Sequence, residues 1–102
     1  MDKSNISKIQ KFSKSVRKNI MEMAFSAGAS SAHLGGALSI VEIVSTLFSH
    51  VMKYNDNPQW PDRDRFILSK GHACLAYYAA LCEIGYISKD ARKLNFYNNL
   101  KW

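Results

Sequence analysis

The sequence predicts a mainly α-helical segment with one short strand, on the strength of three patterns along its 102 residues. Apolar residues repeat at helical spacing over residues 4–27 and fill a second helical segment over residues 39–52. A short apolar run at residues 66–68 then meets a glycine turn that enters another helix. Hydrophobic residues make up 47% of the chain and charged residues 22%, which is ordinary globular composition. We therefore expect one small domain with a marginal core.

The first helix is expected from about Ser4 or Ser7 to Ala27, ending at Gly28. A helical wheel separates an apolar face from a basic face. The apolar face comprises Ile6, Ile9, Phe12, Val16, Ile20, Met23 and Ala27. The basic face comprises Lys3, Lys8, Lys11, Lys14, Arg17 and Lys18. The net charge of +6 therefore indicates a solvated helix face rather than a nucleic-acid partner, because no aromatic platform interleaves the lysines. Attraction of anionic sugar phosphates remains compatible with this face.

Residues 28–38, GASSAHLGGAL, are expected to form a small-residue loop that lets the backbone approach a ligand closely. His33 is the chemically active side chain in this loop, and an imidazole there can bind a substrate oxygen or shuttle a proton. The alternative is a histidine packed between helices. Spacing alone favours that alternative, because catalysis needs a second group within hydrogen-bond reach.

Ser39 and Glu42 form an S-x-x-E pattern, which predicts a capping box at the start of a helix buried on more than one side. Glu42 can also serve catalysis, but capping is the favoured interpretation. The following residues 54–64 carry Pro58 and Pro61, which exclude a continuing helix, and Trp60 is expected to hold this loop in place. A short buried strand is then expected at residues 66–68.

Lys70, Gly71 and His72 lie where this strand would turn into a helix over residues 73–84, which should close at Gly85. A cation and a flexible turn at a helix start favour anions, so the pattern is typical of a phosphate site. The alternative is a hydrogen-bonded structural histidine. A further helix is expected from Ser88 through residue 94 toward residue 100.

Metal, disulfide and membrane functions are not expected. Cys74 and Cys82 would lie about 12 Å apart along one helix, too far for a disulfide, and we expect buried thiols. The three histidines His33, His50 and His72 have no zinc spacing. No apolar run approaches the roughly 20 residues that span a bilayer, and the first residues lack a secretory signal, so a cytoplasmic protein without a membrane partner is expected.

Two longer segments then resemble one enzyme family. SAHLGGALSIVEIVSTLF and NPQWPDRDRFILSKGHACLAYYAAL, within residues 20–86, resemble the N-terminal part of transketolases. The resemblance implies that residues 1–102 are a partial thiamine diphosphate-binding domain from a parent α/β fold, a parallel sheet flanked by helices. It also implies a transferase that moves two-carbon ketol units between sugar phosphates, with thiamine diphosphate as cofactor and an oligomeric state when complete.

The resemblance also implies roles for individual residues. His33 would hydrogen-bond sugar hydroxyls and assist proton transfer, as the catalytic residue of this segment. His72 would help to hold thiamine diphosphate near its diphosphate, where the anion site expected at Lys70 and Gly71 agrees with it. The alternating charges of residues 62–65 are expected to be structural ion pairs that fix the loop.

The chain also departs from the family pattern. Transketolases bind Mg²⁺ through an aspartate and an asparagine that follow a Gly-Asp-Gly, which this sequence lacks, so we expect the Mg²⁺ ligands and the activating glutamate to come from elsewhere. The remaining transketolase domains or a complementary subunit would supply them, and the chain alone is expected to be inactive, with apolar faces exposed on residues 40–52 and 73–84. The alternative is a non-catalytic remnant or interaction module that docks on a transketolase-like partner.

Overall fold

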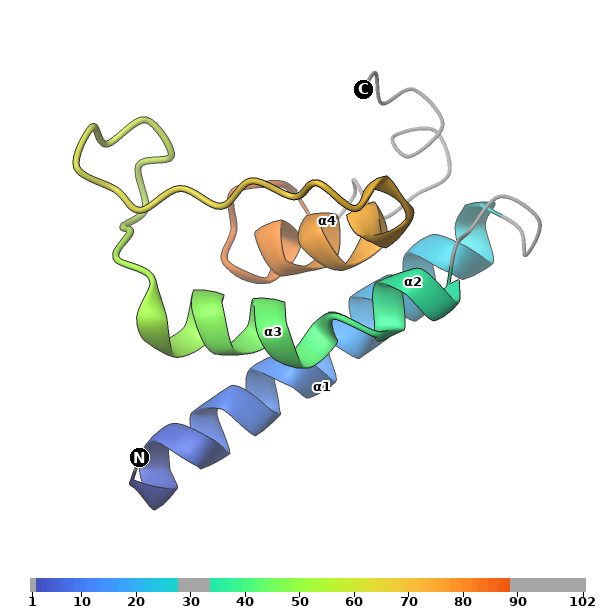
Figure 1. The fold of residues 1–102 in the computed structure, drawn as a ribbon, viewed down its shortest axis with the longest axis horizontal. Helices are drawn as coiled ribbons and strands as arrows, with labels where there is room; N and C mark the ends of the chain where they lie inside the picture. The colour runs from blue at the N-terminus through green and yellow to red at the C-terminus, as the bar shows by residue number, and fades with distance from the viewer. Residues whose placement is uncertain (1, 28–33, 89–102) are drawn as a thin grey trace.

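The fold is a small helical assembly, seen in a computed structural model that describes residues 2–27 and 34–88. The long first helix contacts each of the later α-helices, which lie along it (Figure 1). In chain order the elements are α1 (Lys3–Ala27), α2 (Leu34–Leu38), α3 (Val41–Thr46), the π-helical turn η2 (Leu47–Val51), the 3₁₀ turn η3 (Gly71–Ala73) and α4 (Cys74–Glu83). The predicted mainly helical character is therefore confirmed.

The core forms where α1 meets α3 and α4. All three helices supply fully buried side chains, among them Val16, Ile20, Met23, Val41, Val44, Leu75, Ala76, Ala79 and Ala80, and Ala37 of α2 joins them. The apolar face predicted for α1 thus supplies Val16, Ile20 and Met23 to the core, whereas Ile6 near its start is 42% exposed. Burial weakens toward the N-terminus of α1.

The start of α1 is fixed by a residue that the pattern did not single out. Asp2 accepts hydrogen bonds at Oδ1 from the backbone nitrogens of Ser4 at 2.6 Å and Asn5 at 3.3 Å. This is the N-cap arrangement, and it lets the helix begin at Lys3. The hydrogen bonds from Ser4, with that from Asn5, lower the pKa of Asp2.

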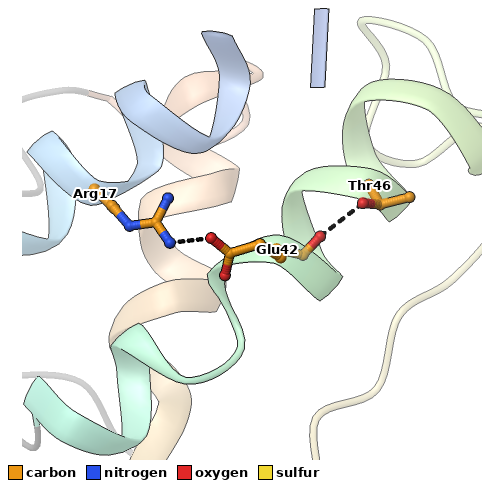
Figure 2. A network of polar contacts seen from close by, with 3 residues as sticks. All are labelled: Arg17, Glu42 and Thr46. Atoms are coloured by element: carbon orange, nitrogen blue, oxygen red, sulfur yellow. Dashed lines mark hydrogen bonds and ion pairs between the residues drawn. The ribbon is translucent and has the colours of Figure 1, made fainter. Parts of the chain in front are cut away.

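The predicted capping box of Ser39 and Glu42 is wrong. The Ser39 hydroxyl donates backward to the carbonyl oxygen of Gly36 at 2.7 Å, and α3 begins after Ile40 with no side-chain cap. The Glu42 carboxylate instead accepts from the Arg17 guanidinium of α1, as Figure 2 shows. Tertiary packing of α1 against α3 outcompetes the local cap, because a guanidinium offers a charged donor.

The Arg17–Glu42 ion pair is expected to contribute little stability, because both side chains are largely exposed. Glu42→Gln should lower the free energy of unfolding by about 0.2–1 kcal/mol at neutral pH. The hydrogen bond from Arg17 lowers the pKa of Glu42, so this contribution is present above the carboxyl's ordinary pKa and disappears as pH falls through the folded value. Urea unfolding of wild type and Glu42→Gln at pH 7 and pH 3 measures the stability lost at each pH. A larger loss of stability at pH 3 than at pH 7 would contradict a stabilising Arg17–Glu42 ion pair.

The predicted strand at residues 66–68 is also wrong, and no strand occurs among the described residues. A strand needs a neighbouring backbone for its ladder, and the described part of the chain supplies no extended partner there. The segment instead lies over α4 as an irregular stretch (Figure 1). The Phe66 ring packs 5.1 Å from the Tyr77 ring and 5.8 Å from the Phe48 ring. Side-chain contacts, not a sheet, hold it there.

The ion pairs predicted within residues 62–65 are absent from the described structure. The Asp64 carboxylate accepts from the backbone nitrogen of Lys53 at 2.8 Å, and the Asp64 backbone nitrogen donates to the Lys53 oxygen at 2.7 Å. Arg63 donates through Nη1 to the Trp60 oxygen at 2.8 Å. Charged side chains therefore do fix this loop, but by capping backbone groups.

The end of α4 agrees with the sequence. Gly85 has a φ of +88°, which favours glycine and ends the helix as predicted. Cys74 and Cys82 are buried, also as predicted, and the described structure places neither in a disulfide. Residues 28–33 of the expected loop and all of the expected further helix beyond Ser88 lie outside the described residues. The rest of that loop is helical, because residues 34–38 form α2.

Exposed apolar side chains occur on only one of the two segments where they were expected. Ile43 and Val51 are 58% and 56% exposed, which confirms the expectation for residues 40–52. Residues 73–84 are instead mostly buried, because α1 covers α4. Ile67 and Phe25 are exposed by 89% and 91%.

No described helix is long and apolar enough to cross a bilayer.

Candidate functional site

The two sequence segments that carry the predicted site residues meet in space, because α2 packs against η3. Gly36 is the point of contact. A Cβ atom on Gly36 would lie 2.9 Å from the main-chain oxygen of His72 and 3.3 Å from its carbonyl carbon. That separation excludes any side chain without a backbone shift. The glycine therefore holds the first segment directly against the helix entry of the second.

A polar link joins the same two segments. The Lys70 ammonium donates to the hydroxyl oxygen of Ser39 at 3.3 Å, and that hydroxyl donates to the Gly36 oxygen at 2.7 Å. A serine hydroxyl can accept one hydrogen bond while donating another. Ser39 thus places the Lys70 ammonium close to the Gly36–His72 contact.

The helix entry itself has features that favour an anion. Lys70 stands at the N-cap of η3 in an extended conformation, and no side chain caps this turn. Gly71 is exposed, and a Cβ atom on it would meet nothing within 4 Å. Neither η3 nor the first turn of α4 carries an acidic residue. An uncapped helix start beside a lysine and an open glycine can bind a phosphate group.

The two predicted histidines differ in what the structure describes. His72 is exposed at the centre of η3, between Gly71 and the buried Ala73. His33 lies outside the described residues, directly before α2 in the sequence. The described structure therefore packs α2, the helix that directly follows His33 in the sequence, against the turn that contains Gly71 and His72. Lys70 lies directly before this turn.

A pocket of about 430 Å³ lies elsewhere, beside the later turns of α4. Five aromatic side chains contribute to its wall: Phe48, Tyr54, Phe66, Tyr77 and Tyr86. Burial raises the pKa of Tyr54 and of Tyr77. Lys70, Gly71 and His72 do not line this pocket, so we place the candidate site at the helix entry, where the charged and open groups gather. Within the described ranges, no three His, Cys, Asp or Glu side chains are grouped to hold a metal.

Sequence reasoning missed Gly36 and Ser39 as parts of the site. Gly36 was included only in a small-residue loop, and Ser39 was interpreted as a helix cap. The adjacent glycines of the first segment were a usable signal for a close backbone approach, although not for its partner. No sequence signal pairs Ser39 with Lys70, because 31 residues separate them.

Comparison with known proteins gives one family. The profile described as "Transketolase, thiamine diphosphate binding domain" matches residues 10–101. That range includes every predicted site residue and both segments of the candidate site.

Individual relatives agree with the profile. The chain is 46% identical over 72 residues to a 6-deoxy-6-sulfo-D-fructose transketolase subunit of Clostridium sp. (strain MSTE9), covering 70% of this chain and 26% of that protein. It is 45% identical over 75 residues to Transketolase-like protein 2 of Homo sapiens, covering 72% and 12%. It is 44% identical over 61 residues to a probable transketolase of Schizosaccharomyces pombe, covering 59% and 9%.

The chain thus spans about a quarter or less of the length of these curated relatives. No solved structure matches it significantly.

Proposed function

Because this chain belongs to the transketolase family, through its thiamine diphosphate-binding domain, we propose that it supplies the first part of a cofactor site in a ketol-transferring enzyme. The reaction is the transfer of two-carbon ketol units between sugar phosphates. The remaining transketolase domains or a complementary subunit complete the site, within an oligomer whose parent fold is α/β. The chain alone is inactive.

The contact between Gly36 and His72 carries this proposal. It brings the segment that follows His33 against Lys70, Gly71 and His72, although more than thirty residues separate the two in sequence. The helix that directly follows His33 in the sequence and the anion site on the cofactor side are thereby neighbours in the fold. That arrangement suits an enzyme in which substrate and cofactor meet.

The residues at the helix entry fit a diphosphate. Lys70 supplies a cation, Gly71 leaves open space, and the η3 turn has no side-chain cap and no acidic residue. Lys70, Gly71 and His72 would hold that end of thiamine diphosphate. When bound, the cofactor supplies the carrier for the two-carbon unit. Mg²⁺ would neutralise the diphosphate through ligands outside this chain.

His33 is proposed to hydrogen-bond sugar hydroxyls and to hold or move a proton at its imidazole, whose ordinary pKa lies near neutrality. The support for this role is its place in the family segment, directly before α2. The second candidate function is a non-catalytic module that docks on a transketolase-like partner. The exposed side chains of Phe25 and Ile67 favour docking under either proposal.

Supplying the full chain to a transketolase that lacks the matching N-terminal segment tests the proposal. Recovery of both thiamine diphosphate binding and ketol transfer would support it. With His33→Ala, transfer should fall while cofactor affinity stays unchanged, since that residue is assigned to the substrate. Docking without any transfer would favour the non-catalytic module, and failure to dock would contradict both candidates.

Lys70→Ala is expected to weaken thiamine diphosphate binding by the completed complex about 10- to 100-fold, because a charge-assisted hydrogen bond to phosphate is lost. Isothermal titration calorimetry in the presence of Mg²⁺ measures the change. Lys53→Ala is the matched control, since it removes an exposed lysine whose described contacts are made by its backbone. Equal losses in the two variants would show a general charge effect and would remove Lys70 from the site.

A further inference from the structure

We infer that Ser39 is a positioning residue for Lys70, holding the lysine ammonium at the helix entry where the cofactor's diphosphate would bind. This inference rests on the proposed function, because it assigns Ser39 a role at the same site. Ser39 itself is assigned no contact with the cofactor. It acts through the hydrogen bond that it accepts from Lys70.

The geometry makes the Ser39 hydroxyl a fixed acceptor. Ser39 donates to the Gly36 oxygen at 2.7 Å, and its backbone nitrogen donates to the Gly35 oxygen at 3.1 Å. Both bonds tie Ser39 to the end of α2, and α2 is seated on η3 through Gly36. The hydroxyl therefore keeps one orientation relative to the backbone of His72. Its oxygen accepts the hydrogen bond from the Lys70 ammonium at 3.3 Å.

Lys70 needs such a partner because its side chain is long and exposed. A free lysine samples many rotamers, and binding an anion must then order the whole side chain. A hydroxyl that already holds the ammonium removes part of that cost. The bond also leaves the ammonium two further donors, since a lysine carries three. Those donors remain available for phosphate oxygens.

In the described structure, no acidic side chain forms an ion pair with Lys70 that would compete with its hydrogen bond to Ser39. A neutral hydroxyl orients the ammonium and keeps its full charge for an anion, whereas a carboxylate would neutralise it. Serine is therefore well suited to position a lysine that must bind phosphate.

The test measures, by mass spectrometry, the acetylation rate of individual lysines of this chain within the complex that completes the cofactor site. Inorganic pyrophosphate, thiamine diphosphate with Mg²⁺ and ribose 5-phosphate are the added probes. Wild-type Lys70 should be protected by the two diphosphates, and Ser39→Ala should raise the concentration needed for half protection about two- to tenfold. Ser39→Ala should also speed acetylation of Lys70 without ligand, while Lys53 serves as the internal reference.

Two variants separate positioning from stability. Ser39→Thr keeps a hydroxyl and should restore protection of Lys70. Thr46→Ala is the matched control, because Thr46 likewise donates to a backbone oxygen, that of Glu42 at 2.7 Å, on the neighbouring helix (Figure 2). It should leave Lys70 unchanged. If Ser39→Ala accelerates Lys53 as much as Lys70, the role of Ser39 is purely structural and the inference fails.

The remaining outcomes distinguish this inference from the proposed function. Equal protection of Lys70 in wild type and Ser39→Ala would overturn the inference and leave the cofactor site intact. A third outcome is that neither diphosphate protects Lys70 in wild type, while Ser39→Ala still speeds its labelling. This result would confirm the Lys70–Ser39 hydrogen bond but overturn the cofactor site and the role of Ser39 in it. Stronger protection by ribose 5-phosphate than by pyrophosphate would assign Lys70 to the substrate and overturn the assignment to the cofactor.

Discussion

The Gly36→Ala substitution is expected to lower the free energy of unfolding by about 1–3 kcal/mol, because it inserts a methyl group where none fits. The new Cβ atom would lie 2.9 Å from the main-chain oxygen of His72. Both groups are fixed by backbone, so no side-chain rotation relieves the overlap, and η3 must move away from α2. Cofactor affinity of the completed complex should fall with it, since His72 and Lys70 move together with η3.

Gly35→Ala is the matched control for this experiment. Gly35 is the preceding residue in the same short helix, and a Cβ atom there meets nothing within 4 Å. Alanine is favoured over glycine in a helix by up to about 1 kcal/mol, so this variant should be neutral or stabilised. Thermal unfolding followed by circular dichroism compares the two, with about 4–8 °C expected per kcal/mol in a domain of this size. Equal melting temperatures would contradict the close packing of α2 on η3.

The Asn19→Asp substitution is expected to lower the free energy of unfolding by about 3–5 kcal/mol at pH 7. Asn19 is only 3% exposed on α1. Its Nδ2 atom donates to the Ala79 oxygen at 3.1 Å and to Glu83 Oε1 at 3.4 Å, both on α4. A carboxylate would replace this donor with a buried charge that faces two acceptors. Such a loss is a large part of the stability of a typical small domain.

The stability lost in Asn19→Asp should increase as pH rises. Burial and the Glu83 carboxylate would raise the folded-state pKa of the introduced carboxyl above its unfolded value of about 3.9. Stability relative to wild type is then lost as pH rises from the unfolded pKa to the raised folded pKa, and is partly recovered on acidification. Asn19→Ala, which adds no charge, should show a smaller and pH-independent loss. Urea unfolding across pH 4 to 7 measures both, and parallel curves for the two variants would contradict the buried charge.

The helices were largely predictable because their signals are local. The apolar face of α1 repeats within a few residues, and the structure buries Val16, Ile20 and Met23 from it. The end of α4 followed from Gly85 in the same way. The candidate site residues Lys70, Gly71 and His72 were also found from local chemistry, a cation and a glycine at a helix entry. Their role in binding a cofactor stays a prediction.

The errors share a different origin. The capping box failed because Glu42 finds Arg17, 25 residues away, and no periodicity encodes that choice. The strand at residues 66–68 failed because a strand is defined by a partner, and the described chain places aromatic side chains there instead. Local patterns indicate which secondary structure a segment favours by itself. The interactions of Glu42 and the conformation of residues 66–68 depend instead on which other segment packs against them.

The sequence by itself determined the family, the amphipathic first helix, the buried thiols and the charged helix entry at Lys70. Those features reside in neighbouring residues or in long motif matches. The tertiary structure alone decided that Gly36 lies against His72 and that Ser39 holds Lys70 across 31 residues of chain. Both contacts depend on how α2 packs against η3. Local sequence signals allow many arrangements of these two elements, and only close packing in the folded molecule selects one of them.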